Sequence, residues 1–365
     1  MRKVKVAVAM SGGVDSGVAA ALLVKKGYQC TGFHLHLWSE ITKDKRFENK
    51  CCSTESLETA KRTAYRLGML FYVLDFSKLF KKQVVDYFLE AYRQGLTPNP
   101  CVVCNRFIKF GELLSYVRRL GFDYLATGHY TRIKDNRLFM GKDKIKDQSY
   151  FLYHLNQKQL AHILFPIGGY LKKEVITMAR EWKLPAAYRP ESQEICFLPE
   201  DDYRPFLKRQ LGNKIIPGDV LDTKGKIIGR HQGLPLYTIG QRHGFSLSSK
   251  IQSSLLPPYY VIGKDIKKNQ LIVGFGQETE KKGFQVKDLN WLSPDYQKQL
   301  LRLDLKVRIR HQGELLRCQL KGNKVILKEA ERGIAPGQSA VFYLPAEASA
   351  KEGYGDEVLG GGIII

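Results

Sequence analysis

Apolar positions in the first half of the chain repeat in the order expected of strands and helices. Val4, Val6 and Val8 alternate with other residues, Ser11-Gly12-Gly13 interrupts the run, and an Ala/Leu/Val-rich stretch from Val14 to Lys26 follows. This predicts a strand, a tight turn and a helix. Further strands are predicted at 30–38, 71–76 and 124–130, with a helix near 56–67. The alternation predicts a doubly wound parallel α/β sheet, with ligands at the carboxyl ends of its strands.

The pattern changes after about Leu211, where short apolar runs are separated by Gly, Pro and Asn turns. These runs are typical of short strands, and they predict two small β-rich modules. The charged segment 276–283, GQETEKKG, has the composition of a linker. We therefore predict three domains, at residues 1–205, 206–276 and 277–365.

The net charge of the chain predicts a polyanionic partner. The chain has 365 residues and a formal charge of +22, from 58 basic and 36 acidic residues. Such an excess favours nucleic acid or an anionic surface, although a lysine-rich proteome would also produce it. No apolar run approaches the length of a membrane span, so no membrane association is predicted. Seven cysteines are too few for a secreted disulfide framework, and we expect a cytoplasmic protein.

The turn at residues 11–16, SGGVDS, has the features of an anion-binding loop. Its glycines let backbone N–H groups approach phosphate, and the helix that follows adds partial positive charge. Ser11 and Ser16 can donate to phosphate oxygens, and Asp15 can bind Mg²⁺ or cap the helix. The Lys of the common G-x-x-x-x-G-K-[ST] loop is missing, which argues against cleavage of the terminal phosphate. S-G-G-x-D-S instead resembles the pyrophosphate loop (PP-loop) of ATP pyrophosphatases.

Cys101 and Cys104, in NPCVVCNRF, are the most informative of the cysteines. Their spacing suits a zinc site, a redox pair or a reactive thiol. The prolines before them predict a loop or a first helical turn, where Arg106 and Lys109 should lower the thiol pKa. Structural zinc is disfavoured, because the only other close pair, Cys51-Cys52, is adjacent rather than spaced. From local sequence alone, Cys196 is equally consistent with a buried apolar residue.

Ten segments, taken together, are similar to the tRNA-specific 2-thiouridylase family. They run in order over nearly the whole chain: AMSGGVDS, TPNPCVVCNRFIKF, ATGHYTR, KDQSYFLYHL, FPIGGYLKKEV, ESQEICF, GRHQGLPLYTIGQR, YYVIGKD, GIAPGQSAVFY and VLGGGIII. The resemblance implies an ATP pyrophosphatase (PP-loop, adenine nucleotide alpha hydrolase-like) domain followed by two β-rich domains. It also implies ATP-dependent 2-thiolation of the wobble uridine of tRNAs with Lys, Glu or Gln anticodons, and a sulfur-relay or cysteine desulfurase protein as donor.

The resemblance also assigns residues. It places ATP, with Mg²⁺, at Ala9, Met10, Ser11, Gly12, Gly13, Val14, Asp15, Ser16, Leu35 and Gly128. It makes Cys104 the nucleophile and Cys196 the carrier of a persulfide. The target base would face Asn99, Pro100 and Cys101. Other tRNA contacts would come from His129, Lys146, Asp147, Gln148, Arg308, Ile309 and Gln338.

The expected chemistry is sound, because adenylation turns the uracil C2 oxygen into a good leaving group that persulfide sulfur can displace. Cys104 would then resolve the persulfide, leaving a disulfide or releasing sulfide. One position departs from the family, since many members carry Asp, assigned to acid/base work, where this chain has Cys101. Three cysteines at 101, 104 and 196 open an alternative carrier, a [4Fe-4S] cluster with one open iron.

Two other functions compete with this one. A PP-loop ligase acting on a small molecule would turn over without RNA and would leave the basic β modules without a purpose. A non-catalytic RNA-binding protein with a metal at Cys101 and Cys104 would bind RNA without ATP chemistry. His34, His36 and His129 are expected to be packed or hydrogen-bonded rather than metal ligands.

Overall fold

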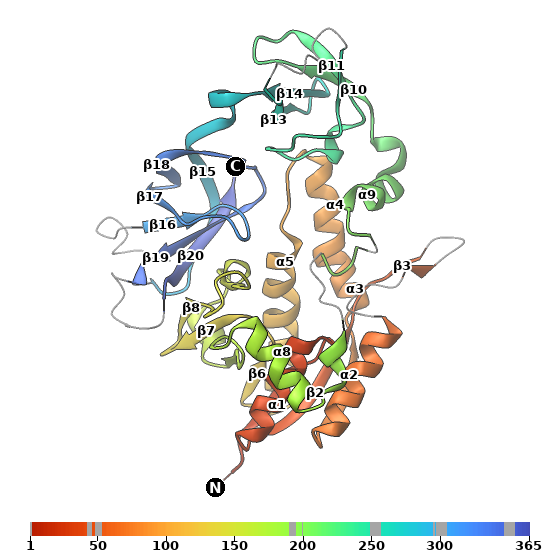
Figure 1. The fold of residues 1–365 in the computed structure, drawn as a ribbon, viewed down its shortest axis with the longest axis vertical. Helices are drawn as coiled ribbons and strands as arrows, with labels where there is room; N and C mark the ends of the chain where they lie inside the picture. Colours follow the sequence, from red (N-terminus) through yellow and green to blue (C-terminus); the bar gives the residue numbers. More distant parts are fainter. Residues whose placement is uncertain are drawn as a thin grey trace.

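The computed structural model describes residues 2–41, 46–47, 53–189, 195–198, 200–248, 257–294, 296, 305–346 and 355–365. Cys51 and Cys52 lie outside these ranges. In Figure 1 a parallel-sheet region lies at the bottom, a second sheet at the top and a barrel at the left, with helices α4 and α5 running between them. In the described part of the chain, no helix is long and apolar enough to cross a membrane.

The first region is built on a five-stranded parallel sheet with the order β5-β2-β1-β6-β9. Its strands are β1 (Lys5–Ala9), β2 (Gln29–His36), β5 (Leu70–Asp75), β6 (Tyr124–Ala126) and β9 (Ile163–Leu164). β1 is central, and Val6, Ala7 and Val8 are fully buried, as its apolar run requires. The predicted parallel α/β sheet is confirmed. The strand predicted at 124–130 is shorter, because the chain turns away after Ala126.

Some helices pack against this sheet, whereas others lie between it and the second sheet (Figure 1). The helices are α1 (Val14–Lys25), α2 (Thr54–Arg66), α3 (Ser77–Phe80), α4 (Asp86–Arg93), α5 (Pro100–Val103), α6 (Leu114–Arg119), α7 (Gln157–Leu160), α8 (Lys172–Glu181) and α9 (Tyr203–Leu211). A π-helical turn, Lys81–Val85, joins α3 to α4, and a π-helical stretch, Cys104–Leu113, joins α5 to α6. π-helical turns are rare in proteins, and those that occur are often found at functional sites. The π-helical stretch that begins at Cys104 is therefore a candidate part of a functional site. A small ribbon, β3 (Glu40–Ile41) with β4 (Arg46–Phe47), lies apart from the main sheet.

The two predicted β modules are present. The central one is a five-stranded sheet, in the order β12-β11-β10-β14-β13. Its strands are β10 (Gly218–Leu221), β11 (Ile227–His231), β12 (Ser246–Leu247), β13 (Tyr260–Asp265) and β14 (Gln270–Gly274). The segment predicted as a linker, 276–283, is a 3-10 turn followed by the first residues of β15.

The last module is a closed six-stranded barrel, in the order β15-β18-β17-β16-β19-β20, with β15 also paired to β20. Its strands are β15 (Glu280–Trp291), β16 (Leu305–Arg308), β17 (Leu316–Lys321), β18 (Lys324–Arg332), β19 (Ser339–Leu344) and β20 (Glu357–Ile364). The sequence pattern did not reveal that a hairpin from the first region, β7 (Thr131–Lys134) and β8 (Arg137–Met140), extends this sheet through a β8–β20 pairing. One apolar core therefore runs continuously from the parallel sheet into the barrel.

Candidate active site

The turn after β1 has the geometry of an anion-binding loop. Ser16 Oγ donates to Gly13 O at 3.0 Å, and Ser11 N donates to Ser16 Oγ at 3.2 Å, so the loop closes on itself at the start of α1. Gly12 has φ +80°, and a Cβ there would lie 2.2 Å from Ser56 O. Only glycine fits this position. The loop thus brings backbone N–H groups and a helix N-terminus to one point.

Asp15 is held by two groups from distant parts of the chain. Lys172 Nζ lies 2.7 and 2.9 Å from its two carboxylate oxygens, and Tyr130 OH donates to Oδ1 at 2.7 Å. The prediction that Asp15 caps α1 is wrong, because Gly13 is the N-cap residue and no side chain caps this helix. The Mg²⁺ alternative fits the site, since this ion is commonly held by one carboxylate together with substrate phosphates.

Two further predicted nucleotide residues lie at the carboxyl ends of β2 and β6, the strands on either side of β1. A Cβ on Gly128 would lie 2.7 Å from Asp15 C and from Ser16 N, so the chain after β6 touches the loop backbone directly. Leu35, near the end of β2, is half-buried. His34 Nδ1 lies 2.9 Å from Met10 O, and burial lowers its pKa. The interpretation of His34 as a packed, hydrogen-bonded histidine is confirmed.

The helix that carries two of the cysteines begins as its prolines predict. Asn99 is the N-cap residue, and its Oδ1 accepts a hydrogen bond from Val102 N at 3.3 Å, with Pro100 in the first turn. Cys101 therefore lies in the first turn, and Cys104 begins the π-helical stretch. The predicted lowering of the thiol pKa is wrong for Cys101. Burial first, and then nearby Cys196, raise the pKa of the Cys101 thiol to about 12, although Lys109 acts in the opposite direction.

Cys196 comes close to this helix from a segment almost a hundred residues further along the chain. It is partly buried, and it packs against the same apolar cluster that contains Cys104. Among the described residues, no group of three or more His, Cys, Asp or Glu side chains could hold a metal ion. Cys101, Cys104 and Cys196 are therefore not grouped as the ligands of an iron–sulfur cluster would be. The same finding gives structural zinc no support.

A cavity of ≈ 700 Å³ lies where the three modules meet. Asn99, Pro100 and Cys101 line it from the helix, and residues of the central sheet and the barrel complete it. Gln148 also lines it, and its Oε1 accepts from Tyr130 N at 3.1 Å. Because the Tyr130 hydroxyl binds Asp15, this single residue joins the cavity wall to the nucleotide loop.

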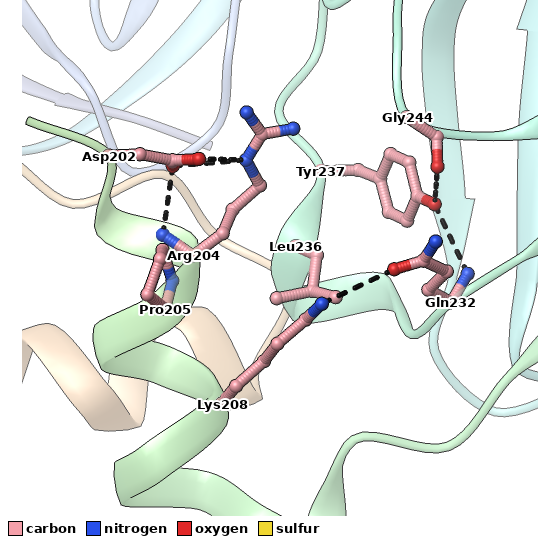
Figure 2. Close-up of a pocket in the computed structure, with 8 residues that line it drawn as sticks. All are labelled: Asp202, Arg204, Pro205, Lys208, Gln232, Leu236, Tyr237 and Gly244. Carbon is pink, nitrogen blue, oxygen red and sulfur yellow. Dashed lines mark hydrogen bonds and ion pairs between the residues drawn. The ribbon is translucent and has the colours of Figure 1, made fainter.

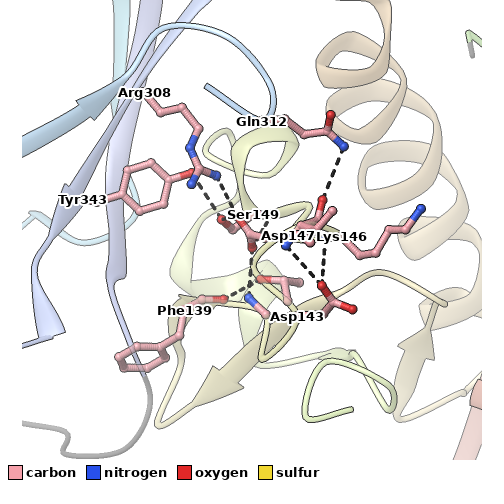
Figure 3. Close-up of polar contacts among 11 residues, drawn as sticks. Phe139, Asp143, Lys146, Asp147, Ser149, Arg308, Gln312 and Tyr343 are labelled. Carbon is pink, nitrogen blue, oxygen red and sulfur yellow. Dashed lines mark hydrogen bonds and ion pairs between the residues drawn. The ribbon is translucent and has the colours of Figure 1, made fainter. Parts of the chain in front are cut away.

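The predicted tRNA contacts differ widely in accessibility. Gln148 and Gln338 line the cavity, whereas Arg308 and Ile309 are buried, at 6% and 2% exposure. In Figure 3 the Arg308 guanidinium points toward Asp147, and its Nη1 donates to Asp147 Oδ2 at 2.9 Å. Lys146, the residue before Asp147, is half-buried. These contacts remain predictions, and for Arg308 the described contacts are internal.

His129, another predicted tRNA residue, is also buried. Its Nδ1 lies 2.6 Å from Thr127 Oγ1, and its Nε2 lies 3.5 Å from Lys109 Nζ. Burial, followed by the charge of Lys109, holds the pKa of His129 well below its usual range. The ring is neutral, and it connects the cysteine helix with the segment that touches the nucleotide loop.

Sequence reasoning missed three residues around the loop. Lys172 and Tyr130 hold Asp15, and Arg189 donates from Nη1 to Gly12 O at 3.3 Å and from Nη2 to Ser56 Oγ at 3.1 Å. Each lies in or beside a segment quoted above for the family resemblance. That position was the only available signal, because a lone Lys, Tyr or Arg carries no pattern of its own.

A second pocket, of ≈ 270 Å³, lies between the start of α9 and the loop that contains Tyr237 (Figure 2). Its charged groups are satisfied locally. Arg204 Nε donates to Asp202 Oδ2 at 2.8 Å, and Lys208 Nζ donates to Gln232 Oε1 at 3.4 Å. We assign it no role in the chemistry.

Comparison with known proteins places the whole chain in one family. Residues 4–200 match a "tRNA methyl transferase HUP domain", residues 204–275 a "tRNA methyl transferase PRC-barrel domain" and residues 281–364 an "Aminomethyltransferase beta-barrel domain". The "tRNA-specific 2-thiouridylase MnmA" of Carboxydothermus hydrogenoformans is 43% identical over 372 residues, covering 99% of this chain and 97% of that protein. The protein of that name from Chloroflexus aurantiacus is 44% identical over 369 residues, covering 98% of each.

A solved structure described as a 4-thiouridine synthetase–RNA complex with bound ATP is also similar. It is 17% identical, covers 57% of this chain and 51% of its own, and has a TM-score of 0.34. The sequence relatives show the family without this structure. Because full-length relatives share more than two-fifths of their residues with it, the chain belongs to the tRNA-specific 2-thiouridylase family.

Proposed function

We propose that this protein is an ATP-dependent tRNA thiolase that converts the C2 carbonyl of the wobble uridine to a thiocarbonyl. One observation carries the proposal beyond family membership. Tyr130 binds Asp15 of the nucleotide loop through its hydroxyl and, through its amide, Gln148 of the cavity that Cys101 lines. A base in that cavity and a phosphate chain on that loop would therefore lie on either side of one residue.

The nucleotide loop supports the first half-reaction. Backbone N–H groups at Ser11 to Gly13, with the N-terminus of α1, suit the phosphates of ATP, and Asp15 is the residue that would hold Mg²⁺. Uridine O2 attacks the α-phosphorus and pyrophosphate leaves. C2 then carries AMP, which leaves far more readily than oxide.

The cysteines support the second half-reaction. The terminal sulfur of a persulfide on Cys196 attacks C2, and AMP departs with the former uridine oxygen. The Cys104 thiolate then attacks Cys196 Sγ, so that the bond between Cys196 and the transferred sulfur breaks. 2-Thiouridine is released and a Cys104–Cys196 disulfide remains, which an external dithiol must reduce. A cysteine desulfurase or relay protein would supply the persulfide.

Cys101 has a different role in this scheme. With its pKa raised to about 12, the thiol stays protonated at neutral pH and is a poor nucleophile. A neutral thiol beside the target base can still donate a weak hydrogen bond. We therefore assign Cys101 to contact with the base, and Asn99 and Pro100 to the same wall of the cavity.

The test is mass spectrometry of nucleosides from unmodified glutamate tRNA after incubation with Mg-ATP, a persulfide-loaded donor and a dithiol. Wild type should form 2-thiouridine and release pyrophosphate only when tRNA is present. Cys104→Ala and Cys196→Ala should abolish the product, Cys101→Ala should reduce it, and Cys30→Ala, on β2 away from the cavity, is the matched control. Pyrophosphate release without tRNA would instead favour a small-molecule ligase.

A further inference from the structure

The cavity has an aromatic wall that the proposed chemistry does not use. Phe151 ends a 3-10 turn after the Asp147 loop, and His311 follows β16 of the barrel. Both line the cavity, together with Cys101. Their ring centroids are 4.4 Å apart, with an angle of 41° between the ring planes. The wall is therefore built at the junction of two modules.

Neighbouring residues fix the positions of Phe151 and His311. Buried Tyr150 lies 5.5 Å from Phe151 and 6.2 Å from His311 between ring centroids, and its hydroxyl donates to Ser339 O at 2.8 Å. Asn105 Nδ2, on the π-helical stretch, donates to Phe151 O at 3.3 Å. A platform that is fixed before binding loses little conformational entropy when a ligand stacks on it.

The electrostatics of the wall suit a nucleobase. Burial, followed by the charge of Arg308, lowers the pKa of His311 to about 4, so its ring is neutral and offers one donor and one acceptor. Its Nδ1 is shielded from solvent and has no hydrogen-bond partner among the described residues. Exposed Arg310 and Arg332 also line the cavity. Each is paired with a glutamate, Arg310 with Glu331 and Arg332 with Glu280, both at 3.0 Å, so a phosphate would have to compete with these carboxylates.

We propose that Phe151 and His311 form a second base-binding subsite, which stacks an unpaired anticodon-loop base adjacent to the uridine being thiolated. The inference rests on the proposed function, because it takes the target uridine to lie against Asn99 and Cys101. Proteins that bind single-stranded RNA commonly stack successive splayed bases on aromatic side chains. Occupying this subsite would fix the register of the loop and hold the target uridine at the cysteines.

The test measures binding of an anticodon stem-loop RNA, and of versions with an abasic nucleotide on either side of the target uridine, by fluorescence anisotropy. Removing a stacked base weakens binding by about 5- to 150-fold. We expect Phe151→Ala to weaken binding of the intact RNA by that factor. For one of the abasic RNAs, whose stacked base is already missing, the same substitution should weaken binding little further. Phe151→Leu, which keeps apolar volume, should behave likewise, and Tyr65→Ala, on the exposed face of α2, should change nothing.

The imidazole is tested separately. His311→Phe should keep the stacking but reduce any preference among the four bases at the affected position. If Phe151→Ala weakens intact and both abasic RNAs equally, the subsite is refuted. The same RNA is scored for 2-thiouridine with wild type. If wild type thiolates the RNA but the loss of RNA binding in Phe151→Ala does not depend on which base is present, only this inference is overturned. If wild type does not thiolate the RNA, the proposed function is overturned.

Discussion

Arg308 provides a sharp test, because the structure and the family resemblance predict different consequences of removing it. Its side chain is 8% exposed and that of Asp147 is 0% exposed. The Asp147 carboxylate accepts from Gly141 N at 2.9 Å, Ser149 N at 3.2 Å and Ser149 Oγ at 2.9 Å, in addition to Arg308 Nη1. Arg308→Ala removes the only cation in this set and leaves a buried carboxylate.

Breaking a buried ion pair from one side costs about 3–5 kcal/mol. Since three other hydrogen bonds to Asp147 survive, we expect a loss near the lower end, about 3 kcal/mol. Arg308→Met combined with Asp147→Asn should recover most of it, because no unpaired charge is left. The loss should appear in the barrel and its junction with the β7–β8 hairpin, where the pair lies.

The assay is urea unfolding followed by the fluorescence of Trp291, on β15, in a background where Trp38 and Trp182 are replaced by Phe. The salt dependence of tRNA binding is measured on the same proteins. A phosphate-contacting arginine would reduce the salt slope by about 1 without a stability loss. If Arg308→Ala unfolds like wild type and reduces the salt slope, the reasoning from burial is refuted.

Two further predictions concern the nucleotide loop and the central module. Gly128→Ala should slow tRNA-dependent pyrophosphate release by about 100-fold, since its Cβ would push Asp15 and Ser16 out of place, whereas Gly169→Ala, with open space around it, should be silent. Lys264 donates to Gly95 O at 3.0 Å, and burial lowers its pKa from 10.5 to about 8. Between pH 8 and 10.5 the unfolded chain binds more protons, so stability should rise with pH by up to about 3 kcal/mol, and Lys264→Met should lose this rise. If thermal unfolding of wild type and of Lys264→Met depends on pH in the same way, this prediction is contradicted. Lys267→Met, at an exposed lysine, is the control and should keep the pH dependence of wild type.

Local features of the chain were readable from sequence. The strand, loop and helix at residues 5–25 follow from apolar alternation and two glycines, and the start of α5 follows from Asn99 and Pro100. Features that depend on residues far apart in the chain could not be predicted from the sequence. The Lys172–Asp15 pair joins positions 157 residues apart, and no local pattern encodes that meeting.

The pKa of Cys101 shows the same limit. Basic neighbours and a helix start suggested a reactive thiolate, but burial outweighs them, and burial depends on how the three modules close around the helix. Arg308 is similar, since the family resemblance assigns it to tRNA, whereas only the structure reveals its burial against Asp147. Sequence reports which groups are present, whereas their surroundings decide their charge state and accessibility.

The pairing of β8 with β20 has a consequence for biosynthesis. Leu138 and Phe139 are fully buried in the finished protein, and their strand pairs with Glu357 and Val358, near the C-terminus. Glu357 also binds Arg137, 220 residues earlier. During synthesis the hairpin leaves the ribosome long before β20, so the outer edge of β8 stays unpaired until β20 has been made. A chain that ends before Glu357 would thus present an unpaired edge of β8 to proteases and chaperones.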